Sequence, residues 1–113
     1  MAKDDYFVVV YKLLHYLYDC LKSGTRPSGA VLNASFFGIN GDYWNYIIRN
    51  LYKDGYVEGV TITRFEGKAD YPSIQPHFGI TPKGIQYLED NTVLKKLKDL
   101  AIDLIPIATA FVP

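Results

Sequence analysis

The apolar period of the sequence changes abruptly at Asp54–Gly55. Before this point apolar side chains recur at the i, i+3, i+4, i+7 spacing of one helix face, at Trp44, Ile47, Ile48 and Leu51. After it, the segment 56–65 is rich in β-branched and aromatic residues, and apolar and threonine positions alternate through 60–63. The pattern predicts a helix over 42–54 joined directly to a strand over 56–65.

The remaining segments are assigned by the same signals. Helical spacing over 4–22 places Phe7, Val10, Leu14, Leu17 and Leu21 on the inner face, and Ser23–Gly24 ends this helix. A shorter helix is expected over 30–37. The stretch 66–73 is typical of a loop, and 77–80 can pair back with the first strand. Thr81 and Pro82 are suited to start a helix that continues to Glu89.

The last segment predicts one more amphipathic helix. Asn91 or Thr92 can cap its start, and Pro106 is expected to end or kink it at about Ile105. The resulting order of three helices, a two-stranded hairpin and a helical tail is that of a winged helix. We therefore predict an α+β, mostly helical fold: a winged helix-turn-helix over 1–90 with a two-stranded wing, and an extra C-terminal helix in 91–113 of the same single domain.

Composition narrows the function classes. Twelve Lys and Arg balance twelve Asp and Glu, so any contact with nucleic acid must depend on local charge. A lone cysteine, Cys20, excludes an intramolecular disulfide, and the start of the chain lacks the pattern of a signal peptide, so we expect a cytoplasmic protein. The apolar segment 100–112 is too short to span a membrane and contains Asp103 and Pro106, so no membrane span is expected.

Three stretches of the sequence are distinctive: Tyr43-Trp44-Asn45-Tyr46-Ile47-Ile48 continuing to Leu51-Tyr52-Lys53-Asp54-Gly55-Tyr56-Val57, the run Ile80-Thr81-Pro82-Lys83-Gly84-Ile85-Gln86-Tyr87-Leu88-Glu89-Asp90-Asn91, and the pair Lys95-Lys96. Through these stretches the chain resembles the YjcQ-like family of small bacterial and phage proteins over most of its length. The resemblance implies a winged-helix fold and a regulatory or phage-related role, and it supplies no catalytic residues. The apolar stretch 104–108 departs from the more charged tail typical of the family.

The second helix of a helix-turn-helix commonly enters the major groove, and the wing contacts the backbone or minor groove. If the apolar stripe of 42–54 faces the core, its opposite face carries Asn45, Tyr46, Arg49, Asn50 and Lys53. Arginine and asparagine can read guanine and adenine edges, and lysine and tyrosine can hold phosphate oxygens. Arg64 and Lys68 of the wing can neutralise phosphates, although Glu66 and Asp70 alternate with them. The alternative is an ordinary solvated face.

The tail offers an apolar face for pairing with a second copy. We expect homodimerisation through Val93, Leu97, Leu100, Leu104 and Ile105, and the alternative is packing onto the first helix of the same chain. Tyr56 and Tyr71 near the hairpin can stack on a base or contact a partner, or can cover the hairpin's own apolar face.

Catalysis finds little support in the sequence. His15 and His77 fall in different elements, no spacing matches a metal or nucleotide motif, and Cys20 fits a small core residue. We therefore expect no catalytic residue, no metal and no cofactor. The predicted function is that of a small DNA-binding protein, a transcriptional or phage regulator that reads duplex DNA with 42–54 and the wing. The alternative is a non-catalytic module that binds a protein partner on a winged-helix scaffold without DNA binding.

Overall fold

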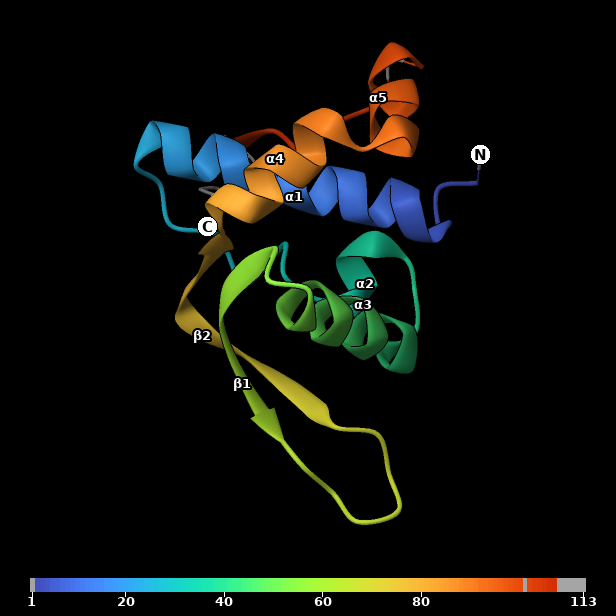
Figure 1. The fold of residues 1–113 in the computed structure, drawn as a ribbon, viewed down its shortest axis with the longest axis vertical. Helices are drawn as coiled ribbons and strands as arrows, with labels where there is room; N and C mark the ends of the chain where they lie inside the picture. The colour runs from blue at the N-terminus through green and yellow to red at the C-terminus, as the bar shows by residue number, and fades with distance from the viewer. Residues whose placement is uncertain (1, 101, 108–113) are drawn as a thin grey trace.

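The computed structural model describes residues 2–100 and 102–107, and Figure 1 shows their arrangement. These residues form helices α1 (Tyr6–Ser23), α2 (Ala34–Phe37), α3 (Gly41–Lys53), α4 (Pro82–Asp90) and α5 (Thr92–Asp99), with strands β1 (Val57–Thr63) and β2 (Tyr71–Ile80) between α3 and α4. The strands pair antiparallel as one two-stranded sheet. The predicted α+β winged-helix arrangement is confirmed. No helix among the described residues is both long and apolar enough to cross a membrane.

Helix α1 is the centre of the core and is buried on more than one face. It contacts β2, α4 and α5, and the consecutive residues Val8, Val9 and Val10 are all buried. A helix surrounded by other elements needs apolar residues around most of its circumference, which explains the valine run. Leu21, which was expected to face inward, is 59% exposed and lines an open cleft with His77 and Phe78 of β2.

Helices α2 and α3 form the helix-turn-helix. Asn33 Oδ1 accepts from Phe36 N at the start of α2, and Asn40 Oδ1 accepts from Tyr43 N at the start of α3. The predicted helix over 30–37 is shorter than expected: residues 29–33 form turns, since the Asn33 cap starts the helix only at Ala34. In α3, Trp44, Ile47, Ile48 and Leu51 are buried as predicted.

The hairpin extends further than predicted, because β2 begins at Tyr71 and pairs Tyr71 with Thr63. Pro72 and Pro76 lie within this strand; a two-stranded sheet has only edge strands, where a missing N–H is tolerated. The register shifts between Glu58 and Val60, and Gly59 at this bulge has φ +81°. A Cβ on Gly59 would lie 2.6 Å from the backbone of Phe78, so this position requires glycine.

Helices α4 and α5 pack on α1 and on each other. Thr81 Oγ1 accepts from Gly84 N and donates to Gly55 O, which ties the start of α4 to the end of α3. The last helix was predicted to continue to about Ile105, which is wrong: α5 ends at Asp99, and residues 102–106 are not helical. Pro106 disfavours helical geometry at Ile105 and cannot donate a backbone hydrogen bond, so the apolar pattern there does not extend the helix.

Candidate nucleic-acid interface

The outward face of α3 carries the five side chains predicted to contact DNA. Tyr46 and Lys53 are exposed, and the other three, Asn45, Arg49 and Asn50, are half-buried. Asn50 Nδ2 donates to Tyr46 O at 2.8 Å, which fixes its amide along the helix and leaves Oδ1 without a protein donor among the described residues. The burial of the opposite stripe in the core is what turns this face outward.

The tip of the hairpin folds toward this face and forms two neighbouring clefts with it. One cleft, of about 600 Å³, lies against the N-terminal half of α3 and contains Asn45, Tyr46 and Lys68. The other, of about 580 Å³, lies against the C-terminal half and contains Asn50, Lys53, Arg64 and Lys68. Arg49, Lys68, Ala69 and Asp70 line both. All seven residues predicted for DNA binding therefore meet on one continuous surface.

Arg49 connects the helix to the hairpin tip. Its Nη1 donates to Asp70 O at 3.2 Å, and its guanidinium carbon lies 5.7 Å from the centre of the Tyr46 ring. An arginine has five N–H donors, so one hydrogen bond leaves others for a phosphate or a base edge. Arg49 therefore joins the hairpin tip to α3 and keeps N–H donors that have no protein acceptor among the described residues.

The charges on this surface are mixed. Within residues 2–100 and 102–107 the ion pairs join His15 with Asp19 and Lys22 with Asp19, so Arg49, Lys53, Arg64 and Lys68 have no carboxylate within 4.0 Å there. Asp42 and Asp70 nevertheless line the same cleft as Arg49 and Lys68. The surface offers four cations for phosphates together with two acidic groups.

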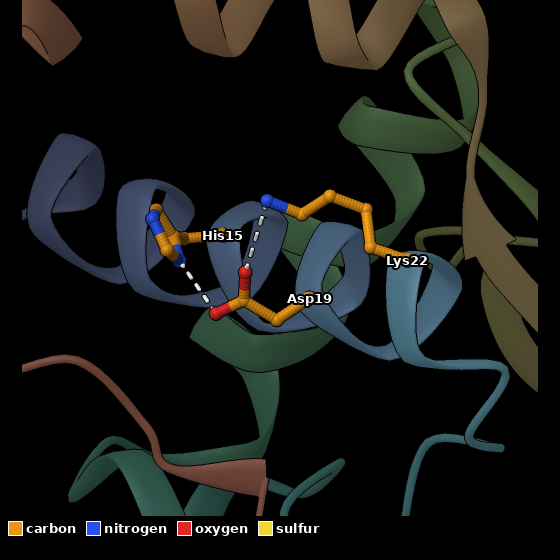
Figure 2. Close-up of polar contacts among 3 residues, drawn as sticks. All are labelled: His15, Asp19 and Lys22. Carbon is orange, nitrogen blue, oxygen red and sulfur yellow. Dashed lines mark ion pairs between the residues drawn. The ribbon is translucent and has the colours of Figure 1, made fainter.

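A separate cleft of about 550 Å³ lies between α1, α4 and α5 and is lined in part by Tyr11, His15 and Lys22. Figure 2 shows Asp19 between His15 and Lys22 on α1: His15 Nδ1 lies 3.0 Å from Asp19 Oδ2, and Lys22 Nζ lies 3.6 Å from Asp19 Oδ1. The first contact does not have hydrogen-bond geometry. No group of three His, Cys, Asp or Glu side chains that could hold a metal occurs within the described part of the chain.

Cys20 is buried in the core, as predicted. Burial raises the pKa of its thiol, which disfavours the reactive thiolate. Tyr56, one of two tyrosines noted near the hairpin, stacks on Tyr87 of α4 with ring centres 4.1 Å apart. Tyr71 is about half exposed. The two tyrosines thus have different roles: Tyr56 packs inside the protein and Tyr71 faces solvent.

The predicted dimerisation residues do not form one exposed face. Leu97 and Ile105 are buried within their own chain and Val93 is half-buried, which favours the alternative that the tail packs onto α1 of the same chain. Leu100 and Leu104 are 61% and 38% exposed. Dimerisation stays a prediction, and only these two leucines have the exposure that it needs.

The sequence analysis predicted Arg64 and Lys68 of the wing for this surface but missed Phe65 at the hairpin tip. Phe65 is half exposed and lines the cleft with Tyr71, Asp42 and Asp70. The signal in the sequence was Phe65 itself, an aromatic residue next to a polar loop. Its position against α3, however, depends on contacts between residues that are distant in the sequence.

Comparison with protein-family models gives a match to the family described as "YjcQ protein" over residues 11–102, which confirms the resemblance. Comparison with curated proteins gives no match. Comparison with solved structures gives none either.

Proposed function

This chain belongs to the YjcQ family, and we propose that it is a non-catalytic DNA-binding protein that contacts duplex DNA with α3 and the wing. The observation that carries the proposal is the meeting of all seven candidate residues, from two elements, on the pair of clefts that share Arg49 and Lys68. In a winged helix this is the surface that faces the duplex. A protein of this kind is suited to regulating transcription.

The residues divide between positioning and readout. Lys53 and Arg64 are exposed, come from different elements and line the same cleft, so they suit phosphates on either side of a groove. Asn45 and Asn50 carry amides that can pair with an adenine edge. Arg49 remains available to a base or phosphate through the N–H groups that do not bond to Asp70 O.

The test is fluorescence anisotropy of a labelled mixed-sequence duplex titrated with the protein at several salt concentrations. We expect affinity to fall with salt, with a log–log slope of about −0.9 for each phosphate contact. The double variant Lys53→Ala, Arg64→Ala removes two such contacts, so the slope should become shallower by roughly two. These cations are preferred to Arg49 because neither has a hydrogen bond to the protein among the described residues.

The control is the double variant Lys95→Ala, Lys96→Ala. These lysines are exposed on α5, at the far end of the molecule from the hairpin (Figure 1). The control removes the same number of positive charges as Lys53→Ala, Arg64→Ala. Because its lysines lie far from the hairpin, the salt dependence of binding should keep the wild-type slope. If both double variants make the slope shallower by the same amount, the phosphate contacts are not made specifically by α3 and the wing.

A second candidate is a module that binds a protein partner on the same surface. The observation that favours it is the presence of Asp42 and Asp70 beside Arg49 and Lys68, since carboxylates repel a phosphate backbone. Absence of duplex binding even at low salt would overturn the DNA proposal and favour this one.

A further inference from the structure

Three half-exposed aromatic rings surround one cleft between α3 and the hairpin tip. Tyr46 comes from α3, Phe65 from the chain just after β1 and Tyr71 from the start of β2; they are 50%, 50% and 49% exposed. All three line the same cleft of about 600 Å³. Rings of this exposure, brought together from three segments, form a surface suited to a planar apolar ligand.

Two of these rings have no aromatic partner inside the described protein. Phe65 and Tyr71 form no ring pair there, whereas Tyr46 is met edge-on by Tyr6 at 6.2 Å between ring centres. Tyr46 is further held beside the Arg49 guanidinium. The cleft therefore has one supported ring on the helix side and two available rings on the hairpin side.

Polar groups stand beside the rings in the same cleft. Asp42 and Asn45 of α3 supply a carboxylate acceptor and an amide with both donor and acceptor atoms. These are the groups that bind the exocyclic amines and ring nitrogens of bases. The hydrogen bond from Arg49 Nη1 to Asp70 O joins the two walls, so Asp42, Asn45 and Tyr46 of α3 face one space with the two rings of the hairpin.

We propose that this cleft binds an unpaired nucleobase, extruded from the duplex or in a single-stranded stretch, by stacking on Phe65, Tyr71 and Tyr46. The proposal rests on the proposed DNA binding and names the form of DNA that the site prefers. A base in the cleft places its neighbouring phosphates outside it, and the adjoining cleft carries Lys53, Arg64 and Lys68. Proteins that bind unpaired strands combine aromatic stacking with a cationic groove in this way.

The charge pattern favours a nucleotide over an apolar peptide. Lys68 and Arg49 line both clefts, so the ring-lined space opens directly onto the cationic one. An apolar peptide segment would gain from the rings but not from the cations, whereas a nucleotide uses both. Binding of a protein segment instead is an outcome that the test below can distinguish.

The test compares two labelled duplexes of equal length, one fully paired and one with a single unpaired adenine bulge, by anisotropy at fixed salt. We expect the bulged duplex to bind roughly 5- to 150-fold more tightly, the range expected for stacking one base. The double variant Phe65→Ala, Tyr71→Ala should lose this preference while retaining binding to the paired duplex. Phe36→Ala, which removes an exposed ring of α2 outside the cleft, should keep the preference.

The variant Phe65→Leu separates stacking from apolar contact and keeps the hairpin tip apolar. We expect it to weaken the preference for the bulged duplex, and a full wild-type preference would overturn the stacking mechanism. Equal affinity of the wild type for the two duplexes would overturn the inference and leave the proposed DNA binding intact. Failure to bind either duplex would overturn the proposed function itself and leave the cleft to a protein partner.

Discussion

The large apolar side chains that remain exposed differ in kind between two regions of the molecule. On α2, α3 and the hairpin they are aromatic: Phe36, Tyr46, Tyr52, Phe65 and Tyr71. At the end of α1 and after α5 they are leucines: Leu21, Leu100 and Leu104. We refer to these as the aromatic region and the leucine region.

The difference matters because the two residue types interact with different partners. A ring presents a flat π face that stacks on any base, whereas a leucine gains chiefly from the apolar area that it buries. The cations Arg49, Lys53, Arg64 and Lys68 all lie in the aromatic region. The aromatic region therefore suits nucleic acid, and the leucine region suits at most another apolar surface.

The largest expected effect comes from a leucine that the tail buries inside its own chain. Leu97→Ala removes a fully buried side chain of α5, and we expect the free energy of unfolding to fall by about 2–5 kcal/mol. Urea denaturation followed by circular dichroism measures this loss. If α5 instead contributes only to a dimer, the loss should disappear at low protein concentration, where the monomer predominates.

The matched control is the double variant Leu100→Ala, Leu104→Ala. Both leucines are substantially exposed, so we expect stability to change by less than about 1 kcal/mol. Sedimentation equilibrium of the same variant tests dimerisation, since these leucines are the exposed members of the predicted interface. An unchanged dimer fraction would show that they do not form it.

A smaller effect is expected from the bulge that shapes the wing in the aromatic region. Gly59→Ala forces a Cβ into a left-handed conformation and against the Phe78 backbone, so we expect a loss of about 2–4 kcal/mol. Gly67→Ala at the hairpin tip is the control: its φ is +75°, but no atom lies within 4 Å of the added Cβ. It should cost only the conformational penalty, about 1–2 kcal/mol. Equal losses in the two variants would show that the backbone adjusts in Gly59→Ala, so that the added Cβ no longer clashes with Phe78.

Elements whose signals lie close together along the chain were predicted better than elements that depend on distant contacts. Helices α1, α3 and α4 were predicted well because their apolar spacing and capping residues act within a few positions along the chain. The start of β2 was missed because Pro72 and Pro76 suggest a loop, and only pairing with β1 shows that they lie on an edge. Dependence on distant contacts is the common reason for such errors.

The candidate site shows the same division. The outward face of α3 followed from helical geometry, so its five residues were identified correctly as sharing one face. The hairpin tip meets that face through a hydrogen bond between residues 21 positions apart, Arg49 and Asp70. That contact is not apparent from the sequence, so Phe65 and Tyr46 could not be assigned to the same cleft in advance.

The connection between α3 and the wing can be weakened without changing charge. Arg49→Lys keeps the cation but loses the planar donor group that reaches Asp70 O, and we expect the free energy of unfolding to fall by about 0.5–1.5 kcal/mol. Arg64→Lys is the control, because Arg64 is exposed and makes no protein hydrogen bond among the described residues; it should remain within about 0.5 kcal/mol of the wild type. If the two variants behave alike, the Arg49 contact does not hold the wing.

The smallest expected effect concerns Tyr6, the α1 ring that meets Tyr46 of the aromatic region. Burial, followed by the neighbouring Tyr87, raises the pKa of the Tyr6 hydroxyl to about 12. The unfolded chain then loses this proton near pH 10, before the folded protein does, so the stabilising contribution is complete below pH 10 and is lost as the pH rises toward 12. Tyr6→Phe removes the ionisable group, and its melting temperature should therefore fall less steeply over this interval.

Melting curves recorded at intervals from pH 9 to pH 12 measure the two slopes. The fall will not vanish in Tyr6→Phe, since burial also raises the pKa of Tyr11, Tyr16, Tyr43 and Tyr87. Equal slopes for Tyr6→Phe and the wild type would mean that Tyr6 is solvated when folded, and the edge-on support that it gives Tyr46 would then be too loose to fix the helix side of the base-binding cleft.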